Sequence, residues 1–260
     1  MTILDELAAH ARQRVAAARQ IVPSEALRRR ARALPRGDFA FEKALAKPGL
    51  SFICEVKRAS PSKGLIAPEF PYLDVARAYE AAGADCISVL TEPKWFLGSD
   101  EYLKEIAATV SIPCLRKDFT VDEYMIYEAK CLGASAVLLI CSILSQEEIA
   151  GFIALADTLG ITSLVEAHDE NEVRMALAAG ARVIGVNNRN LRDFTVDTDN
   201  SRRLRDLVPD DVLFVSESGV KNAQDVVCVR ALGADAVLVG ETLMRADDKK
   251  AKLAELKGLP

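Results

Sequence analysis

Residues 81–90 read Ala-Ala-Gly-Ala-Asp-Cys-Ile-Ser-Val-Leu, and similar segments occur three more times in the 260-residue chain, at 131–140, 178–186 and 231–240. Each segment joins an alanine-rich helix end to a glycine and then to an apolar run. This order is typical of a helix that ends in a left-handed glycine before a buried strand. The four glycines lie 50, 47 and 53 positions apart. Because one strand and its helix take about half that length, each repeat spans two βα units.

Four further apolar runs supply the remaining strands, one before the first of these segments and three between successive segments. They cover residues 51–57, 112–117, 162–166 and 212–217. The expected helices between strands include residues 73–82, 123–132, 146–159, 170–179 and 223–232. Eight short strands that alternate with helices predict an α/β fold, a single (β/α)8 TIM barrel. An open doubly wound sheet is the alternative, and it is less favoured because no Gly-x-Gly-x-x-Gly follows the first strand.

The segment before the first strand differs from the rest in charge. Residues 1–36 hold eight arginines and three acidic residues, so they carry +5 while the remainder of the chain carries −10. Such a segment could be a transit peptide, but Asp5, Glu6 and Glu25 interrupt it and hydroxyl residues are few. We expect a helical extension over residues 1–45, with helices at 8–20 and 24–33, on a single barrel domain of 1–260. The second helix has a start signal in Pro23-Ser24-Glu25.

The composition argues against a nucleic-acid-binding, a membrane or a secreted protein. The net charge of −5 gives no reason to expect nucleic acid as a partner. The longest apolar stretch, residues 134–144, is too short to span a bilayer, and no secretory signal is seen. Cys54, Cys86, Cys114 and Cys141 fall in apolar runs, and no Cys-x-x-Cys occurs, so we expect reduced, buried thiols. These features favour a cytoplasmic protein without membrane partners, and we expect a monomer.

Polar residues follow nearly every apolar strand, at the ends where barrel enzymes place their active sites. A purely structural role would require several separate buried ion pairs, each with a desolvation penalty. One polar site at the mouth of the barrel explains them together. The charged and amide residues concerned are Glu55, Lys57, Lys117, Glu166, Asn187, Arg189 and Glu217.

Two strand ends resemble phosphate-binding turns. Ser218-Gly219 and Gly240-Glu241 follow the seventh and eighth strands, where barrel enzymes commonly hold a phosphate. Glycine lets backbone N–H groups approach an anion, although these glycines could also serve only the turns. Ser60 and Lys63, in the loop after the first strand, could close over the ligand.

The acid–base set consists of Lys57, Lys117, Glu55, Glu166 and Glu217. We expect His168 to belong to a helix-capping loop beside Asp169 rather than to the catalytic set. A metal site at Glu166 and His168 lacks further ligands at a recognisable spacing. Phe96 and Phe119 also follow strand ends. One such ring usually only packs, whereas two at one mouth suggest a flat apolar group on the substrate.

Seven segments resemble the indole-3-glycerol phosphate synthase family, and the resemblance covers nearly the whole chain, to about residue 245. The segments are Glu55-Val-Lys-Arg-Ala-Ser-Pro-Ser-Lys-Gly64, Leu90-Thr-Glu-Pro-Lys-Trp-Phe96, Leu115-Arg-Lys-Asp-Phe119, Leu164-Val-Glu-Ala-His168, Gly185-Val-Asn-Asn-Arg-Asn-Leu191, Ser216-Glu-Ser-Gly219 and Val239-Gly-Glu-Thr-Leu-Met244.

This resemblance implies a lyase of tryptophan biosynthesis that needs no cofactor or metal. It converts 1-(2-carboxyphenylamino)-1-deoxyribulose 5-phosphate to indole-3-glycerol phosphate, CO2 and water. Lys117 matches the general acid of ring closure, Lys57 matches the lysine that orients the substrate carboxylate, and Glu166 matches the acid or base of dehydration.

The resemblance also implies the binding residues, by their position in the matching segments. Glu55, Asn187 and Glu217 would surround the reacting centre, with Arg189 in a supporting role. Phe96 and Phe119 would pack against the anthranilate ring. The phosphate would be held by Ser60, Ser218, Gly219, Gly240 and Glu241.

One position departs from part of the family, because serine often occupies the place of Glu241. A carboxylate would repel phosphate, so we expect only the backbone N–H of Glu241 to face it. Arg58 and Asp118 fall between inward-facing positions and are expected to support loops. Two other readings stay open at this point, a Schiff-base aldolase that uses Lys57 or Lys117 and an inactive barrel that binds phosphorylated ligands.

Overall fold

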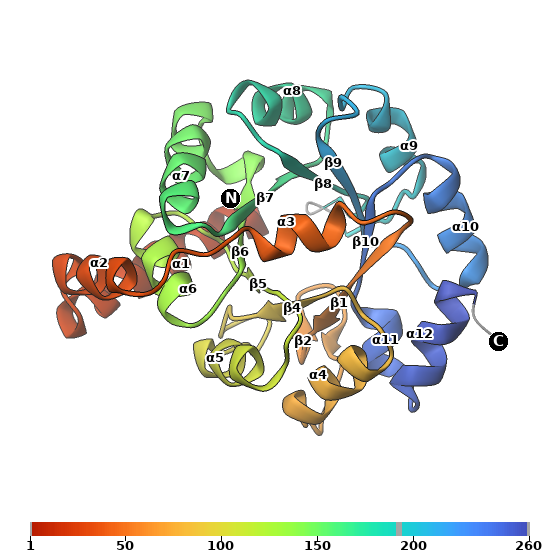
Figure 1. Cartoon of the computed structure of the whole chain (residues 1–260), viewed down its shortest axis with the longest axis horizontal. Helices are drawn as coiled ribbons and strands as arrows, with labels where there is room; N and C mark the ends of the chain where they lie inside the picture. Colours follow the sequence, from red (N-terminus) through yellow and green to blue (C-terminus); the bar gives the residue numbers. More distant parts are fainter. Residues whose placement is uncertain (1, 191–193, 259–260) are drawn as a thin grey trace.

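The barrel expected from the repeats is present. The computed structural model describes residues 2–190 and 194–258, in which parallel strands close in the order β1-β10-β9-β8-β7-β6-β5-β4 (Figure 1). The bounds of these strands are β1 Ser51–Val56, β4 Cys86–Leu90, β5 Cys114–Lys117, β6 Ala136–Ile140, β7 Thr162–Ala167, β8 Val183–Asn187, β9 Leu213–Glu217 and β10 Ala236–Val239. Closure pairs Cys54 of β1 with Val239 of β10 on one side and with Ile87 of β4 on the other.

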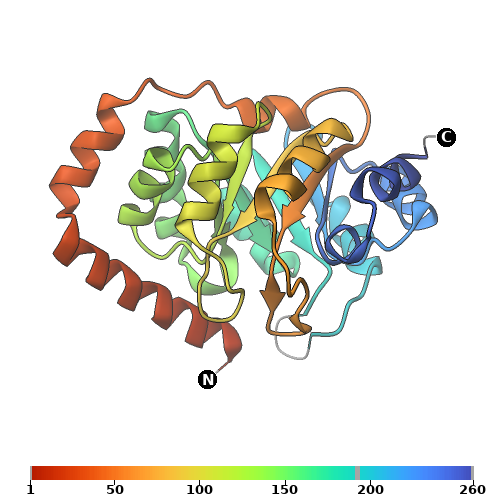
Figure 2. The ribbon, with the colours of Figure 1, turned by 90° about the horizontal axis from the view of Figure 1, so that it is seen from below.

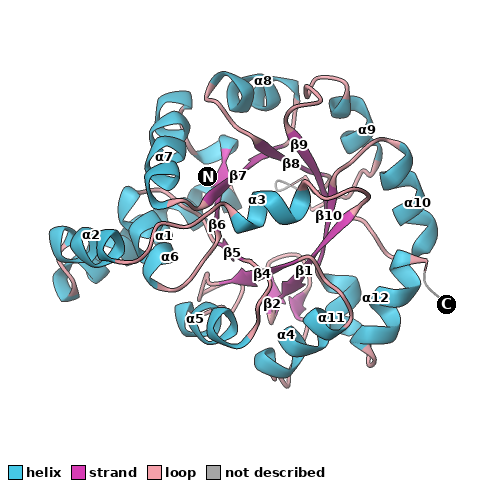
Figure 3. Ribbon diagram, in the orientation of Figure 1, coloured by secondary structure: helices cyan, strands magenta, loops and turns pink. Residues whose placement is uncertain are grey.

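Helices surround the strands on all sides (Figure 3). Those that follow the barrel strands are α4 Tyr72–Ala81, α5 Asp100–Thr109, α6 Glu123–Cys131, α7 Gln146–Leu159, α8 Glu170–Ala178, α9 Asp199–Arg205, α10 Ala223–Ala231, α11 Glu241–Arg245 and α12 Lys249–Lys257. The predicted helices agree with these bounds to within one residue. The short 3₁₀ helix η1 Cys141–Ile143 follows β6.

The repeated glycines end helices as their positions predict. Gly83, Gly133, Gly180 and Gly233 have φ values of 80°, 86°, 86° and 78°. This left-handed conformation strains other residues, and it turns the chain from a helix end directly into the next buried strand.

The extension contains three helices, one more than the sequence analysis found. They are α1 Ile3–Ile21, α2 Ser24–Ala33 and α3 Ala40–Leu45. Helix α1 begins five residues earlier than predicted, because Thr2 and Asp5 form a capping box whose Thr-x-x-Asp signal the prediction overlooked. Helix α2 begins at Ser24, as predicted.

These helices wrap the barrel from one end to the other (Figure 2). Helix α1 lies near the ends where the strands carry their polar residues, α2 packs against α6, and α3 crosses the opposite end. Phe41 and Leu45 of α3 are completely buried there. The extension thus covers apolar surface at the bottom of the barrel and also reaches its mouth.

The loop after the first strand folds into a small hairpin of β2 Ala59–Ser60 and β3 Gly64–Leu65, for which no strands were predicted. Of the cysteines, Cys54, Cys86, Cys114 and Cys141 are buried free thiols, as predicted, although Cys141 lies in η1 and not in a strand. Among the described residues, no helix combines the length and apolar character needed to cross a membrane.

Candidate active site

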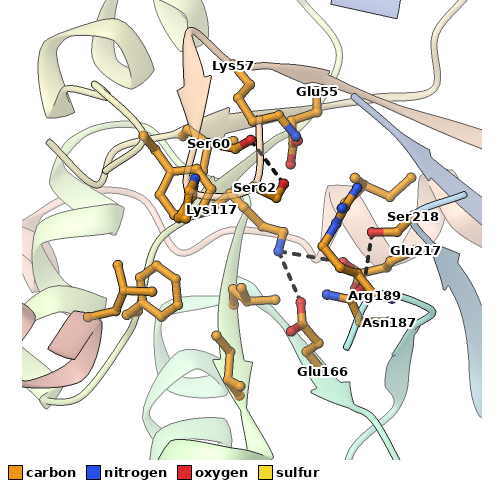
Figure 4. A pocket seen from close by; sticks show the side chains of 18 of the residues that line it. Glu55, Lys57, Ser60, Ser62, Lys117, Glu166, Asn187, Arg189, Glu217 and Ser218 are labelled. Atoms are coloured by element: carbon orange, nitrogen blue, oxygen red, sulfur yellow. Dashed lines mark hydrogen bonds and ion pairs between the residues drawn. The ribbon is translucent and has the colours of Figure 1, made fainter. Parts of the chain in front are cut away.

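A cavity of about 110 Å³ lies at the polar ends of the strands (Figure 4). The structure brings most of the predicted site residues together on its wall. These are Glu55, Lys57, Ser60, Phe96, Lys117, Phe119, Glu166, Asn187, Arg189, Glu217, Ser218 and Glu241. The other two, Gly219 and Gly240, are chain neighbours of Ser218 and Glu241.

Lys117 lies at the centre of the charged groups, at the end of β5. Its Nζ is 3.1 Å from Glu166 Oε2 at the end of β7 and 3.6 Å from Glu217 Oε2 at the end of β9 (Figure 4). The two carboxylates come from strands that are not neighbours in sequence, and barrel closure alone brings them to one amine.

A second ion pair lies at the end of β1, where Lys57 Nζ is 2.5 Å from Glu55 Oε1. The carboxylate of Glu55 also accepts a hydrogen bond from Ser88 Oγ at 3.3 Å. A Cβ atom on Gly240 would lie 2.5 Å from Glu55 Oε1 and 2.9 Å from Lys57 Nζ. Gly240 therefore makes room for this pair, which is a role that the sequence analysis did not assign to it.

Another glycine makes room for Glu217. A Cβ atom on Gly185 of β8 would lie 2.1 Å from Glu217 Oε1, closer than any contact that real side chains make. The absence of a side chain at Gly185 lets the carboxyl group of Glu217 lie over the neighbouring strand and reach Lys117. Gly185 is not among the predicted site residues, although it begins one of the segments that resemble the family. A glycine inside a strand, which often marks a close approach, was the signal for it.

Electrostatics keep Lys117 protonated. Burial by itself would lower its pKa, but the carboxyl groups of Glu166, Glu217 and Glu55 outweigh burial, and the pKa of Lys117 is raised. Burial would likewise raise the pKa of Glu166, but Lys117 and then His168 oppose it and hold that pKa below its usual value. The ground state is thus an ammonium of Lys117 beside a carboxylate of Glu166.

Glu217 behaves in the opposite way. Burial raises its pKa, the ammonium of Lys117 opposes this, and the negative charges of Glu166 and Glu55 raise it further, to about 8. Glu217 Oε1 makes no hydrogen bond within the described part of the chain. At neutral pH the pair of Glu166 and Glu217 therefore shares one proton, and Glu217 has the higher pKa of the two.

The rest of the wall is apolar. The rings of Phe96 and Phe119 have centroids 6.0 Å apart and planes inclined at 40°. Leu90, Leu138 and Ile140 from the barrel strands line the same cavity. A flat aromatic group fits between such surfaces.

Helix α1 contributes Ile3, Leu4 and Leu7 to this wall, and the sequence analysis missed all three. The capping box at Thr2 was the signal, because it starts a helix whose first two turns carry these apolar residues. The extension is therefore part of the cavity as well as a cover for the barrel.

The opposite side of the cavity carries the turns predicted to bind phosphate. Ser218 and Gly219 have positive φ values of 67° and 101°, and Ser218 Oγ donates a hydrogen bond to Asn187 Oδ1 at 3.0 Å. The carboxylate of Glu241 is engaged by Arg245 at 3.0 Å and lies 3.8 Å from Lys63 Nζ of the first loop. These cations offset its charge, which matters at the one position that departs from the family pattern.

Asp118 supports the loop after β5, as predicted. It accepts hydrogen bonds from Arg14 Nη2 of α1 at 2.5 Å, from Thr91 Oγ1 at 2.5 Å and from the backbone N–H of Phe119 at 2.8 Å. The extension is therefore bonded directly to the strand end that carries Lys117 and Phe119.

His168 lies where the prediction placed it, next to the N-cap residue Asp169 of α8. Its ring, however, approaches the charged cluster more closely than expected for a capping loop, with Nε2 3.5 Å from Glu166 Oε1. It lines an adjacent polar cavity of about 440 Å³, together with Ser142, Glu172 and Arg203. Leu4, Asn187 and Arg189 line both cavities. Within the described ranges, no group of three or more His, Cys, Asp or Glu side chains is arranged to hold a metal ion.

Comparisons with known proteins agree with this geometry. Solved barrels similar to the chain include 3-hexulose-6-phosphate synthase, with a TM-score of 0.64 and 18% identity over 80% of this chain and 99% of that one. Thiamine phosphate pyrophosphorylase from Pyrococcus furiosus has a TM-score of 0.61 and 17% identity over 84% and 96%. At these identities the likeness concerns the fold alone.

The sequence relatives are much closer. The indole-3-glycerol phosphate synthase of Ruminiclostridium cellulolyticum is 57% identical over 98% of this chain and 99% of its own. That of Leuconostoc mesenteroides is 54% identical over 85% of each chain. The family profile described as indole-3-glycerol phosphate synthase matches residues 4–256. The chain therefore belongs to the indole-3-glycerol phosphate synthase family.

Proposed function

We propose that the chain closes the indole ring of 1-(2-carboxyphenylamino)-1-deoxyribulose 5-phosphate and releases indole-3-glycerol phosphate, CO2 and water. The observation that carries this proposal is the ammonium of Lys117 between Glu166 and Glu217, beside the paired rings of Phe96 and Phe119. An acid next to a flat apolar slot suits a reaction in which an aromatic carbon attacks a carbonyl group.

The substrate would bind with its two ends on opposite walls. Phe96 and Phe119 would hold the anthranilate ring, and Lys57 would orient its carboxylate. Glu55, Asn187 and Glu217 would bind the middle of the substrate, with Arg189 in support.

The phosphate would lie at the far end. Ser60 and Ser218 line the cavity, and Gly219 and Gly240 are chain neighbours of the lining residues Ser218 and Glu241. Only the backbone N–H of Glu241 would face the phosphate, because Arg245 and Lys63 engage its carboxylate.

Ring closure would use the proton that Lys117 already carries. As the ring carbon attacks the carbonyl carbon, a new C–C bond forms and the carbonyl oxygen takes the proton from Lys117 Nζ. The bond to the carboxylate then breaks, CO2 leaves, and its electron pair restores the aromatic ring. Lys117 is left as a neutral amine.

Dehydration would then need both an acid and a base. Once protonated, Glu166 would give a proton to the departing hydroxyl, and water would leave. The neutral Lys117 would remove a proton from the adjacent CH2 group, which forms the indole double bond and restores the ammonium. Because a carboxylate leaves as neutral CO2, the whole reaction consumes one proton per turnover.

The charge state of Lys117 argues against a Schiff-base aldolase. Such an enzyme needs a neutral amine in its resting state, whereas the three carboxyl groups raise the pKa of Lys117. Treatment with borohydride and a sugar phosphate would therefore leave the protein mass unchanged.

We further propose that residues 1–260 act as one domain, in a cytoplasmic monomer. Leu4 and Leu7 of the extension line the cavity at the mouth of the barrel, which supports the first point. Light scattering of the purified protein would test the second.

The proposal is tested by mixing the purified, metal-free protein with the substrate and following indole fluorescence. Indole formation without any added cofactor is the expected result. A folded protein that binds the intact substrate without turnover would instead support the inactive phosphate-binding barrel.

A further inference from the structure

We propose that His168 is a proton relay that recharges Glu166 from the second, polar cavity while the substrate fills the first. This inference rests on the proposed function, since it supplies the one proton that each turnover consumes. It assigns a role to a residue that the mechanism above does not use.

His168 lies between the two cavities. Glu166 lines the cavity of Lys117 and not the polar one, whereas His168 lines the polar cavity and not that of Lys117. The imidazole Nε2 is 3.5 Å from Glu166 Oε1 and makes no hydrogen bond in the part of the chain that is described. A modest approach of the two atoms would make this contact a hydrogen bond, as happens in many sites when the ligand binds.

Glu172 of α8 holds the opposite edge of the imidazole ring, where Nδ1 lies. Glu172 Oε2 accepts a hydrogen bond from the backbone N–H of His168 at 2.7 Å and lies 3.2 Å from Nδ1. Glu172 Oε1 accepts a second bond from Ser142 Oγ at 2.6 Å. This arrangement aims Nε2 at Glu166 and leaves Nδ1 on the side of the polar cavity.

The polar cavity offers a route to water that does not pass the substrate. Arg203 and Asp197, which line it, are exposed at the surface and paired at 2.9 Å. The substrate would close the cavity of Lys117 with its own ring and phosphate. A proton that reaches Glu166 from the polar cavity would not have to pass the bound substrate, and it would leave the proton on Glu217 in place.

The charged groups around the imidazole ring of His168 favour its protonated form. Burial lowers the pKa of His168, but the hydrogen bond to Glu172 and the negative charges of Glu166 and Glu172 raise it above its ordinary value, and the carboxyl group of Glu217 adds only the smallest contribution. These carboxyl groups face the ring from β7, α8 and β9. Asp169, Asp197, Arg189 and Arg203 also line the polar cavity.

The transfer is driven by the chemistry at Lys117. As long as Lys117 is an ammonium, it holds the pKa of Glu166 low. When Lys117 has given its proton to the carbonyl oxygen, this stabilisation is lost and the pKa of Glu166 rises. The proton then moves from Nε2 of His168 to Oε1 of Glu166, and Glu166 passes it to the departing hydroxyl. His168 is left neutral, with its remaining proton on Nδ1 toward Glu172. Nε2 then takes up a proton from a hydronium ion that enters through the polar cavity, which completes the uptake of one proton per turnover.

The test separates CO2 release from indole formation in a single turnover. Ring closure and CO2 release use only the proton on Lys117, so H168Q retains their rate to within about twofold. Indole formation should slow by about 10- to 100-fold, which is the lower part of the range for a lost acid–base group. In H168A, added imidazole should restore indole formation, while it has no effect on the wild type.

Arg203→Gln is the matched control, since it alters the same cavity without touching the ring of His168. It should keep both rates. Equal slowing of CO2 and indole in H168Q would mean a structural role and overturn the relay, as would unchanged rates of both. If the wild type forms no indole, the proposed function itself fails, and this result is distinct from any outcome in the variants.

Discussion

Glu217 should lower the free energy of unfolding as the pH rises, and Glu217→Gln should remove this pH dependence. The side chain is only 2% exposed, its Oε1 makes no hydrogen bond in the described residues, and its pKa is about 8. At neutral pH the folded protein therefore keeps a proton that the unfolded chain releases. Glutamine has nearly the same shape and cannot ionise.

The sign and size follow from proton linkage. The pKa of Glu217 is raised from 4.5 to about 8, so the free energy of unfolding is unaffected by this group below pH 4.5 and falls as the pH rises toward 8. Each pH unit inside this window costs about 1.4 kcal/mol. Between pH 5 and pH 7 the loss comes to about 2.5 kcal/mol.

Urea denaturation of both proteins at pH 5, 6, 7 and 8 measures this effect. The variant should gain about 2.5 kcal/mol relative to the wild type between pH 5 and pH 7, because the titrations of groups that do not interact with Glu217 cancel in the difference. Glu80→Gln is the control. The pKa of Glu80 is lowered, so this carboxylate stays ionised in both states and its difference stays flat. A flat difference for Glu217→Gln would refute the reasoning, because it would place the pKa of Glu217 near that of the unfolded chain.

Three other outcomes follow from the same geometry. Lys117→Ala should lower kcat by about 10²- to 10⁴-fold with KM within a few-fold, measured by indole fluorescence, and near-normal turnover would remove Lys117 from its role. Gly185→Ala should lower kcat by about 10-fold or more by displacing Glu217, whereas Gly151→Ala, which meets open space on α7, should leave kcat unchanged. Arg14→Met should lower the free energy of unfolding, measured by urea denaturation, by about 3 kcal/mol, because it leaves Asp118 buried without its closest cation. A second change, Asp118→Asn, should recover part of this loss. Additive effects of the two changes would contradict the pairing.

The sequence determined the barrel because its information is local and repeated. The alternation of apolar strands with helices, and the glycine after each alanine-rich helix end, specify the same βα unit again and again. Glu55, Lys117 and Glu217 could be named in advance because each follows an apolar strand, and parallel strands in a barrel point their ends to one side. The start of α1 was also encoded locally, in Thr2 and Asp5, although the prediction overlooked it.

Other features depended on contacts between distant segments. Only barrel closure places Glu166 and Glu217 beside one amine, and burial together with Coulomb interactions then leaves one of them ionised and the other protonated. The position of His168 between two cavities and the place of Leu4 in the cavity wall were decided in the same way. The physical reason is that a pKa and a cavity depend on distances through space and on the exclusion of water, whereas a sequence pattern fixes only the local conformation and the face on which a side chain lies.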